Sequence, residues 1–271
     1  MSLTDSIEIT RRVCPIIFLL DTSGSMEGQP IGAVDAAIEG VIPLLGDMNE
    51  GGSDAEIKIS ILTFSNGIEW VTGDHLIAPE EYTHRKLQAH GLTDMGAAFL
   101  ALNQKLSRRT GFMRHASGSV APVIFLLSDG EPSDDYRSAL HLLQQNNWFR
   151  ISGKVAVGYG DDCNFDVLLE FTGSKETVIR ADTPEDLRKM IRFVAITSSK
   201  VASTSHAIDP DASSEEVAKP DDNTGRIAKE LCDTGAGIIK YPDDEQQDEA
   251  ISLDEIQNAP MSSNSADEDF E

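Results

Sequence analysis

The sequence contains few of the residues that would indicate a disulfide framework, a zinc cage or a membrane span. Its three cysteines, Cys14, Cys163 and Cys232, lie far apart and form no C-x-x-C pair. This spacing favours neither disulfide bonds nor a cysteine-ligated zinc site, and a reducing compartment is the simplest interpretation. No apolar run approaches the roughly 20 residues that span a bilayer, and residues 1–12 lack the apolar core of a signal peptide. We therefore expect a cytoplasmic protein.

Positive charge is also scarce. The 271 residues include 22 Lys and Arg against 46 Asp and Glu, a formal net charge of −24 at pH 7. Residues 201–271 hold 19 acidic and 4 basic residues and so carry −15, which leaves 27 acidic and 18 basic residues, or −9, on residues 1–200. Phosphates would be repelled by this balance, which disfavours nucleic acid and anionic membranes as partners. Partners should offer basic patches or meet the protein through a cation.

Short apolar runs alternate with helical patterns along residues 13–200, which is typical of crossover units and a mostly parallel sheet. Strands are expected at residues 13–20, 56–64, 68–72, 120–127, 154–160 and 177–181, and helices at residues 30–45, 95–109, 134–149, 166–173 and 186–196. Ser65, Asn66 and Gly67 separate two of the strands and indicate a hairpin, so one edge strand should be antiparallel. Pro43 is expected to end or kink the first helix.

The chain is expected to contain one folded domain and a tail. We divide it into an N-terminal extension of residues 1–11, a domain of residues 12–204 and an acidic tail of residues 205–271. In the tail Asp, Glu, Ser and Pro dominate and hydrophobic periodicity is lost, which indicates disorder. A weakly apolar stretch at residues 231–239 is the part of the tail that could dock on the domain.

Three segments rich in side-chain oxygen are predicted to meet at one edge of the sheet. The run D-T-S-G-S at residues 21–25 follows the first strand, Asp129 follows the strand at residues 120–127, and Thr93 precedes a helix. Ligands of open α/β sheets bind outside the carboxyl ends of the strands, near the switch point in strand order. Because no Lys or Arg lies in these segments, a hard divalent cation would balance the oxygen atoms.

Mg²⁺ suits this set better than Ca²⁺ or Zn²⁺, because it binds about six oxygens, keeps water ligands and tolerates neutral hydroxyls. We expect the hydroxyls of Ser23, Ser25 and Thr93 to be direct ligands. Asp21 and Asp129 would bind the ion directly or through water and orient the hydroxyls. Mn²⁺ or Ca²⁺ are possible substitutes. An open coordination position would attract a carboxylate from elsewhere.

These motifs resemble the metal-ion-dependent adhesion site of von Willebrand factor A domains. The resemblance is carried, in order, by D-T-S-G-S at residues 21–25, the threonine of G-L-T-D-M-G at residues 91–96 and S-D-G at residues 128–130, and it covers roughly residues 12–202. It implies a doubly wound, mostly parallel, six-stranded α/β sheet with one antiparallel edge strand. It also implies a domain that binds protein through Mg²⁺ rather than performing chemistry.

Within that family the chain is most similar to the bacterial TerY-like proteins of tellurite-resistance and stress gene clusters. The similarity rests on the segments ISILTFS, GLTDMGAAF, FLLSDGEPSDD and RFVAITSSKVAS. It implies an adaptor or scaffold role beside a protein kinase and a phosphatase encoded in the same cluster.

Three functional classes remain open: an interaction module whose partner donates an Asp or Glu to the ion, a metal-dependent phosphohydrolase, and a structural domain that metal merely stabilises. The sequence offers no nucleophile with a histidine partner and no G-x-x-x-x-G-K motif, which weighs against the enzyme. A carboxylate from the acidic runs at residues 243–249 and 267–271 could also bind the ion, in the same chain or in a neighbouring copy, and so suppress partner binding.

Several residues near the motifs have simpler interpretations. Asp94, Ser133, Asp134 and Asp135 are interpreted as helix caps rather than ligands. Met26 is interpreted either as a contact for a partner or as an ordinary packed methionine.

Overall fold

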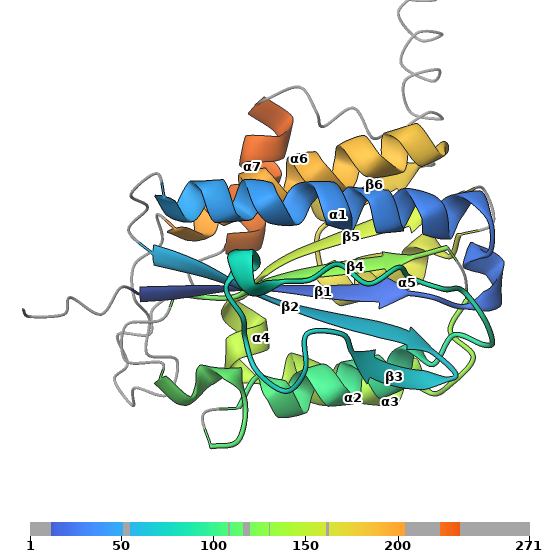
Figure 1. Cartoon of the computed structure of the whole chain (residues 1–271). Helices are drawn as coiled ribbons and strands as arrows, with labels where there is room; N and C mark the ends of the chain where they lie inside the picture. Colours follow the sequence, from blue (N-terminus) through green and yellow to red (C-terminus); the bar gives the residue numbers. More distant parts are fainter. Residues whose placement is uncertain are drawn as a thin grey trace, which may run out of the picture. The chain divides into compact units, whose positions relative to one another are not determined.

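The computed structural model describes residues 12–50, 55–107, 109–115, 120–129, 131–160, 163–203 and 223–233. Within these residues six strands form one sheet with helices on both faces (Figure 1). The strands are β1 (Arg12–Asp21), β2 (Ala55–Ser65), β3 (Gly67–Trp70), β4 (Val123–Ser128), β5 (Gly153–Tyr159) and β6 (Val178–Ala181).

The strand order is β3-β2-β1-β4-β5-β6, and every neighbouring pair is parallel except β2 and β3. The predicted hairpin is confirmed, because Ser65 pairs with Gly67 and Gly67 has φ +87°, a conformation that glycine adopts without strain. The direction of winding reverses between β1 and β4, which is the switch point of a doubly wound fold. The predicted fold class is therefore confirmed.

Seven helices accompany the sheet in the described part of the chain: α1 (Gln29–Glu50), α2 (Met95–Lys105), α3 (Tyr136–Gln144), α4 (Asn147–Ile151), α5 (Phe165–Thr172), α6 (Pro184–Ser203) and α7 (Asn223–Asp233). Short 3₁₀ turns are η1 (Gly24–Met26), η2 (Pro79–Glu81), η3 (Phe112–His115) and η4 (Lys175–Thr177). α1 packs with α6 above the sheet in the view of Figure 1, and α2 packs with α3 below it. None of the described helices combines the length and hydropathy that a membrane span requires.

Both faces of the central strand are buried. Ile16 and Phe18 of β1 belong to the core under α1, and the alternate residues Ile17 and Leu19 are equally inaccessible to solvent. Phe18 stacks on Phe125 of β4 with ring centroids 5.1 Å apart. A strand covered on both faces needs an unbroken apolar run, which explains the sequence VCPIIFLL.

Several expected helix boundaries were wrong, including the ends of α2 and α6, and two of the differences have a clear local cause. α1 continues through Pro43 to Glu50, and Pro43 lies on the exposed face, where water can hydrogen-bond the carbonyl that has lost its partner. The single helix expected at residues 134–149 is instead α3 and α4. They are separated because the Asn146 side chain accepts the N–H of Trp148 at 2.9 Å and starts a new helix.

The expectation of disorder throughout residues 205–271 was also wrong for residues 223–233, which form α7. Ile227 and Leu231, one turn apart, are buried, and the helix packs against β5 and α6. The folded domain therefore includes a segment beyond residue 204. The other residues of the expected tail, and residues 1–11, lie outside the described part of the chain.

Candidate metal centre

The candidate site begins at Asp21, where β1 ends. Its side chain is fully buried, with one carboxylate oxygen accepting the N–H of Ser23 at 2.8 Å and the other accepting the hydroxyl of Ser128 at 2.6 Å. Leu20 is in register with Leu127, so Ser128 is the residue of β4 that follows beside Asp21. The carboxylate therefore ties the turn after β1 to the end of β4.

The two motif serines and Asp129 form a chain of hydrogen bonds. Ser25 Oγ donates to Asp129 Oδ1 at 2.8 Å, and Ser23 Oγ lies 2.9 Å from Ser25 Oγ. A hydroxyl carries one hydrogen, so Ser25 has none left and Ser23 must be the donor to Ser25. The hydroxyl hydrogens of Ser23 and Ser25 are thus both used within this series of hydrogen bonds. The remaining lone pairs of all three residues can only accept hydrogen bonds or bind a cation.

The loop that carries Thr93 lies against the same motif. His90 donates its backbone N–H to the carbonyl of Thr22 at 2.8 Å, and Gly24 donates to the carbonyl of Gly91 at 3.0 Å. A Cβ at Gly24 would lie 3.2 Å from that carbonyl, so the close approach favours glycine. Thr93 is 7% exposed. The structure therefore brings the backbones of all three predicted segments to one edge of the sheet.

The residues after Asp129 hold Thr93 in place. Ser133 Oγ accepts the N–H of Thr93 at 3.0 Å, and the N–H of Ser133 donates to the Thr93 carbonyl at 2.9 Å. Ser133 was predicted to be a helix cap, and this exchange of two hydrogen bonds shows a different role. It fixes the distance between the loop that carries Asp129 and the loop that carries Thr93.

Asp134 caps a helix, as predicted, but not the helix that follows it in sequence. Its carboxylate accepts the N–H groups of Gly96 at 2.8 Å and Ala97 at 2.9 Å, at the start of α2. A Cβ at Gly96 would lie 2.9 Å from a carboxylate oxygen of Asp134, so a larger residue would displace this cap. The start of α2, and with it Thr93, is therefore fixed by a segment about 40 residues away.

Asp135 and Asp94 complete the set of predicted caps. Asp135 accepts the N–H of Ser138 at 3.2 Å and caps α3 as predicted. Asp94 occupies the N-cap position of α2 but makes no capping bond there, and it accepts the N–H of Gly67 at 2.7 Å. Met26 is fully buried, which makes it a packed methionine.

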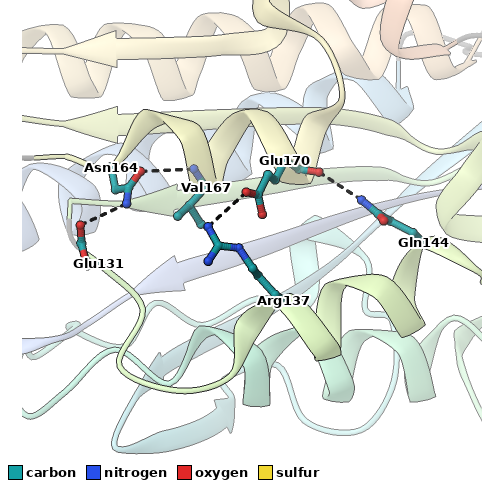
Figure 2. Close-up of polar contacts among 6 residues, drawn as sticks. All are labelled: Glu131, Arg137, Gln144, Asn164, Val167 and Glu170. Atoms are coloured by element: carbon teal, nitrogen blue, oxygen red, sulfur yellow. Dashed lines mark hydrogen bonds and ion pairs between the residues drawn. The ribbon is translucent and has the colours of Figure 1, made fainter.

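A second set of polar contacts holds the far side of the loop after Asp129 (Figure 2). Asn164, just before α5, donates to Glu131 at 3.2 Å. Arg137 of α3 lies 3.4 Å from Glu170 of α5, and Gln144 donates to the Glu170 carbonyl at 3.2 Å. These contacts are exposed and individually weak. One joins the loop to the residue before α5, and the other two join α3 to α5.

Both carboxyl groups of the site are in surroundings that disfavour their ionised forms. Burial raises the pKa of Asp21, against the lowering effect of the hydrogen bonds from Ser128 and Ser23. Burial also raises the pKa of Asp129, and the nearby charge of Asp21 adds to the effect, against the hydrogen bond from Ser25. Among the described residues neither carboxylate forms an ion pair. A cation would relieve this imbalance.

The donor chemistry fits a hard ion. The described residues contain no group of three or more His, Cys, Asp and Glu side chains that could hold a metal, so a centre here depends on hydroxyl oxygens. Cys163 lies close, with its thiol 3.6 Å from the Ser128 carbonyl, but burial raises its pKa to about 12. It is therefore a neutral thiol, and the thiolate that soft metals prefer is absent at this position.

Comparison with known proteins identifies the family. The model of the von Willebrand factor type A domain matches residues 16–192. Inter-alpha-trypsin inhibitor heavy chain H1 of Mesocricetus auratus is 26% identical over 158 residues, which is 56% of this chain and 17% of that protein.

Two solved structures share the fold. Proximal thread matrix protein 1 from the mussel byssus superposes with a TM-score of 0.51 at 16% identity, over 68% of this chain and 47% of its own. The pilus adhesin SpaC of Lactobacillus rhamnosus GG gives a TM-score of 0.53 at 14% identity, over 69% of this chain and 30% of its own. The mussel protein is also known with zinc in its metal-ion-dependent adhesion site (MIDAS) motif. This chain matches less than half the length of each of these relatives. Because the family model matches residues 16–192, the chain belongs to the von Willebrand factor type A domain family.

Proposed function

We propose that this domain is a Mg²⁺-dependent protein-interaction module. The proposed ligands, direct or through water, are Asp21, Ser23, Ser25, Thr93 and Asp129. The observation that carries the proposal is the series of hydrogen bonds from Ser23 through Ser25 to Asp129, with oxygen separations of 2.9 and 2.8 Å, which uses both hydroxyl hydrogens and leaves the hydroxyl oxygens only lone pairs to offer. The ion would supply an electrophilic coordination position that an Asp or Glu of a partner protein can fill.

The protein's own groups prepare this site. Asp21 fixes the backbone of Ser23, and Ser128 fixes Asp21, so the hydroxyls are oriented before any ligand arrives. The all-oxygen donor set favours Mg²⁺, with Mn²⁺ or Ca²⁺ as substitutes. Zinc in the MIDAS motif of the mussel protein supports divalent-ion binding by this family more generally.

The direct test is metal binding by the whole chain. Mn²⁺, followed by electron paramagnetic resonance, is expected to bind one site and to be displaced by Mg²⁺. Ser25→Ala should weaken Mn²⁺ binding by about tenfold or more, because it removes a ligand from an exposed position that the fold does not need. Ser138→Ala, an equally exposed serine in α3, is the matched control. Equal affinity in Ser25→Ala and the unaltered protein would refute the site.

Partner capture separates the three functional classes. Proteins retained from native extract with Mg²⁺, but lost with a chelator or with Ser25→Ala, support the interaction module. Turnover of a generic phosphoester that Asp21→Ala abolishes would support a phosphohydrolase instead. If chelation lowers the melting temperature but changes no binding, the metal has a structural role only. A captured kinase or phosphatase would support the TerY-like assignment and the tellurite-resistance setting, which stay predictions from sequence resemblance.

The acidic runs at residues 243–249 and 267–271 are proposed to compete for the same site. Because α7 packs on the domain, a useful truncation must follow residue 239 rather than residue 204. The truncated chain is expected to bind a carboxylate ligand more tightly than the whole chain in Mg²⁺, since an internal competitor acts at high effective concentration. Equal affinities would exclude the competition.

A further inference from the structure

A polar cleft of about 450 Å³ lies beside the candidate metal centre. One wall is the end of β2 with β3, and the other is the irregular segment of residues 85–90, which leads away from η2 toward the carboxyl ends of the strands (Figure 1). Thr22 lies between the two walls, where its carbonyl accepts the N–H of His90. The cleft therefore opens at the same edge of the sheet as the metal centre.

The cleft begins where the core under α1 ends. Along β2, Ile57, Ile59 and Ile61 point into that core. The next two residues on the same face are Thr63 and Ser65, and both line the cleft. Apolar residues would be suitable at these positions if the space were filled by core packing. Hydroxyls there instead make this wall polar: Thr63 Oγ1 donates to the Glu69 carbonyl at 3.4 Å and keeps its lone pairs, and Ser65 adds a second hydroxyl.

Positive charge gathers around the cleft in a chain whose net charge is −24. Arg85 and Lys86 line it, with Glu69 as the one acidic lining residue. Arg85 and Glu69 lie 3.4 Å apart, with side chains 69% and 64% exposed. Such an exposed pair contributes little to stability, so a carboxylate from another molecule can replace Glu69 at Arg85 at low cost.

The cleft and the metal centre are built from the same two chain segments. Thr22 lines the cleft and Ser23 follows it, while His90 lines the cleft and Gly91 follows it. The N–H of Gly24 bonds to the Gly91 carbonyl at 3.0 Å, which joins the segments between the two places. A short extended peptide bound at the centre can therefore lead directly into the cleft.

We propose that the cleft is a second subsite for the protein segment that binds the metal centre, and that this segment is acidic and extended. One carboxylate goes to the centre, and a carboxylate a few residues along the same segment goes to Arg85 and Lys86. The inference rests on the proposed function, and it adds the class of partner. Charge complementarity favours an acidic segment over a basic or apolar one, because the lining offers two cations and several hydroxyls, with Ile68, Val71 and Leu87 as its apolar minority.

Two blocked, fluorescent peptides test the subsite on the whole chain. One carries a single Glu among Gly and Ser, and the other carries four consecutive Glu residues. In Mg²⁺ the four-Glu peptide should bind about tenfold more tightly, and Arg85→Gln combined with Lys86→Gln should remove most of that gain while leaving the one-Glu peptide unaffected. Glu69→Gln should tighten the four-Glu peptide. Arg137→Gln, which removes another exposed arginine that pairs with a glutamate at 3.4 Å, is the matched control.

The outcomes distinguish this inference from the proposed function. If Mg²⁺ strengthens binding of both peptides but the Arg85 and Lys86 substitutions change neither, the cleft is not a subsite and only this inference fails. If the substitutions weaken binding of the four-Glu peptide but a chelator changes the binding of neither peptide, the proposed function fails. The inference that one segment binds both the metal centre and the cleft then fails with it. Absence of binding by both peptides would overturn both.

Discussion

Two ends of the sheet, formed by neighbouring strands, satisfy their polar groups in different ways (Figure 1). At the start of β5, helix α7 packs on the strand and pairs backbone groups of Ile151, Ser152 and Lys154. At the carboxyl ends of β1 and β4, hydroxyls and carboxylates bond to one another and retain acceptor capacity. The comparison separates a polar cluster that stabilises the fold from one that awaits a ligand.

At the amino end, each polar group of the contact has a partner of opposite kind. Asn223 donates to the Ile151 carbonyl at 3.1 Å, and Thr224 donates to the Ser152 carbonyl at 3.2 Å. The Thr224 hydroxyl also accepts the N–H of Lys154 at 3.2 Å. Donors and acceptors are balanced, so the contact is complete within the protein.

At the carboxyl ends of β1 and β4, hydrogen-bond acceptors outnumber donors. The hydroxyl hydrogens of Ser23 and Ser25 are already used, and burial raises the pKa of both Asp21 and Asp129. The surplus consists of acceptors, and a cation is the complement that they lack. Stability and ligand binding should therefore respond to different substitutions at the two ends.

The largest expected effect is on stability, at the amino end. Ile227→Ala should lower the free energy of unfolding by about 2–4 kcal/mol, because it empties a fully buried position. If the substitution detaches α7, the loss of unfolding free energy is limited to the free energy with which the helix docks on the domain. Denaturant unfolding measures it, with the exposed Lys229→Ala as control. Mn²⁺ affinity should not change, and an equal loss of affinity would contradict the separation of the two ends.

A smaller effect is expected at the carboxyl end, and only with metal present. At a Mg²⁺ concentration 100 times the dissociation constant, the unaltered protein should gain about 2.7 kcal/mol. Asp129→Asn should lose most of this gain, while its metal-free stability is kept or raised, because the amide carbonyl can still accept from Ser25 and the buried charge is removed. Asp135→Asn, at the cap of α3, is the control. The measurement is thermal unfolding with Mg²⁺ and with a chelator, and equal Mg²⁺ gains in both variants would contradict the prediction.

The sequence predicted that Asp21 and Asp129 would lie at one edge of the sheet for a simple reason. Asp21 and Asp129 each end an apolar run, and parallel strands of a doubly wound sheet end at the same edge. Side-chain partners were not predictable in this way. Ser128 bonds to Asp21 because of the register between β1 and β4, and a one-residue shift of register would break that contact.

Long-range capping and weak amphipathic segments also escaped prediction. Capping rules consider residues next to a helix in sequence, whereas Asp134 caps α2 from a segment about 40 residues away. α7 was missed because Ile227 and Leu231 are a stripe of two apolar residues in a polar stretch. Its stability comes from packing on β5 rather than from its own propensity.

The pH dependence of metal-free stability should sharpen the electrostatic side of the comparison. Because the folded-state pKa of Asp21 is raised by burial, its favourable contribution is present below the unfolded value, about 3.9, and is lost as pH rises through the raised value. With a chelator present, Asp21→Asn should therefore gain stability relative to the unaltered protein as pH rises from about 4 to about 7. Denaturant midpoints across this range measure the trend. A constant difference would mean that the Asp21 charge is already balanced without metal.

The smallest expected difference compares two adjacent aspartates. Asp134→Ala and Asp135→Ala each remove a helix cap and should each cost about 1 kcal/mol of stability. Only Asp134 fixes the start of α2, directly after the loop that carries Thr93, so only its loss should weaken Mn²⁺ binding, by about threefold. Titration of Mn²⁺ into both variants at equal folded fraction isolates this effect. Equal Mn²⁺ affinities would show that Ser133 alone holds Thr93, because its two backbone-linked hydrogen bonds remain in both variants.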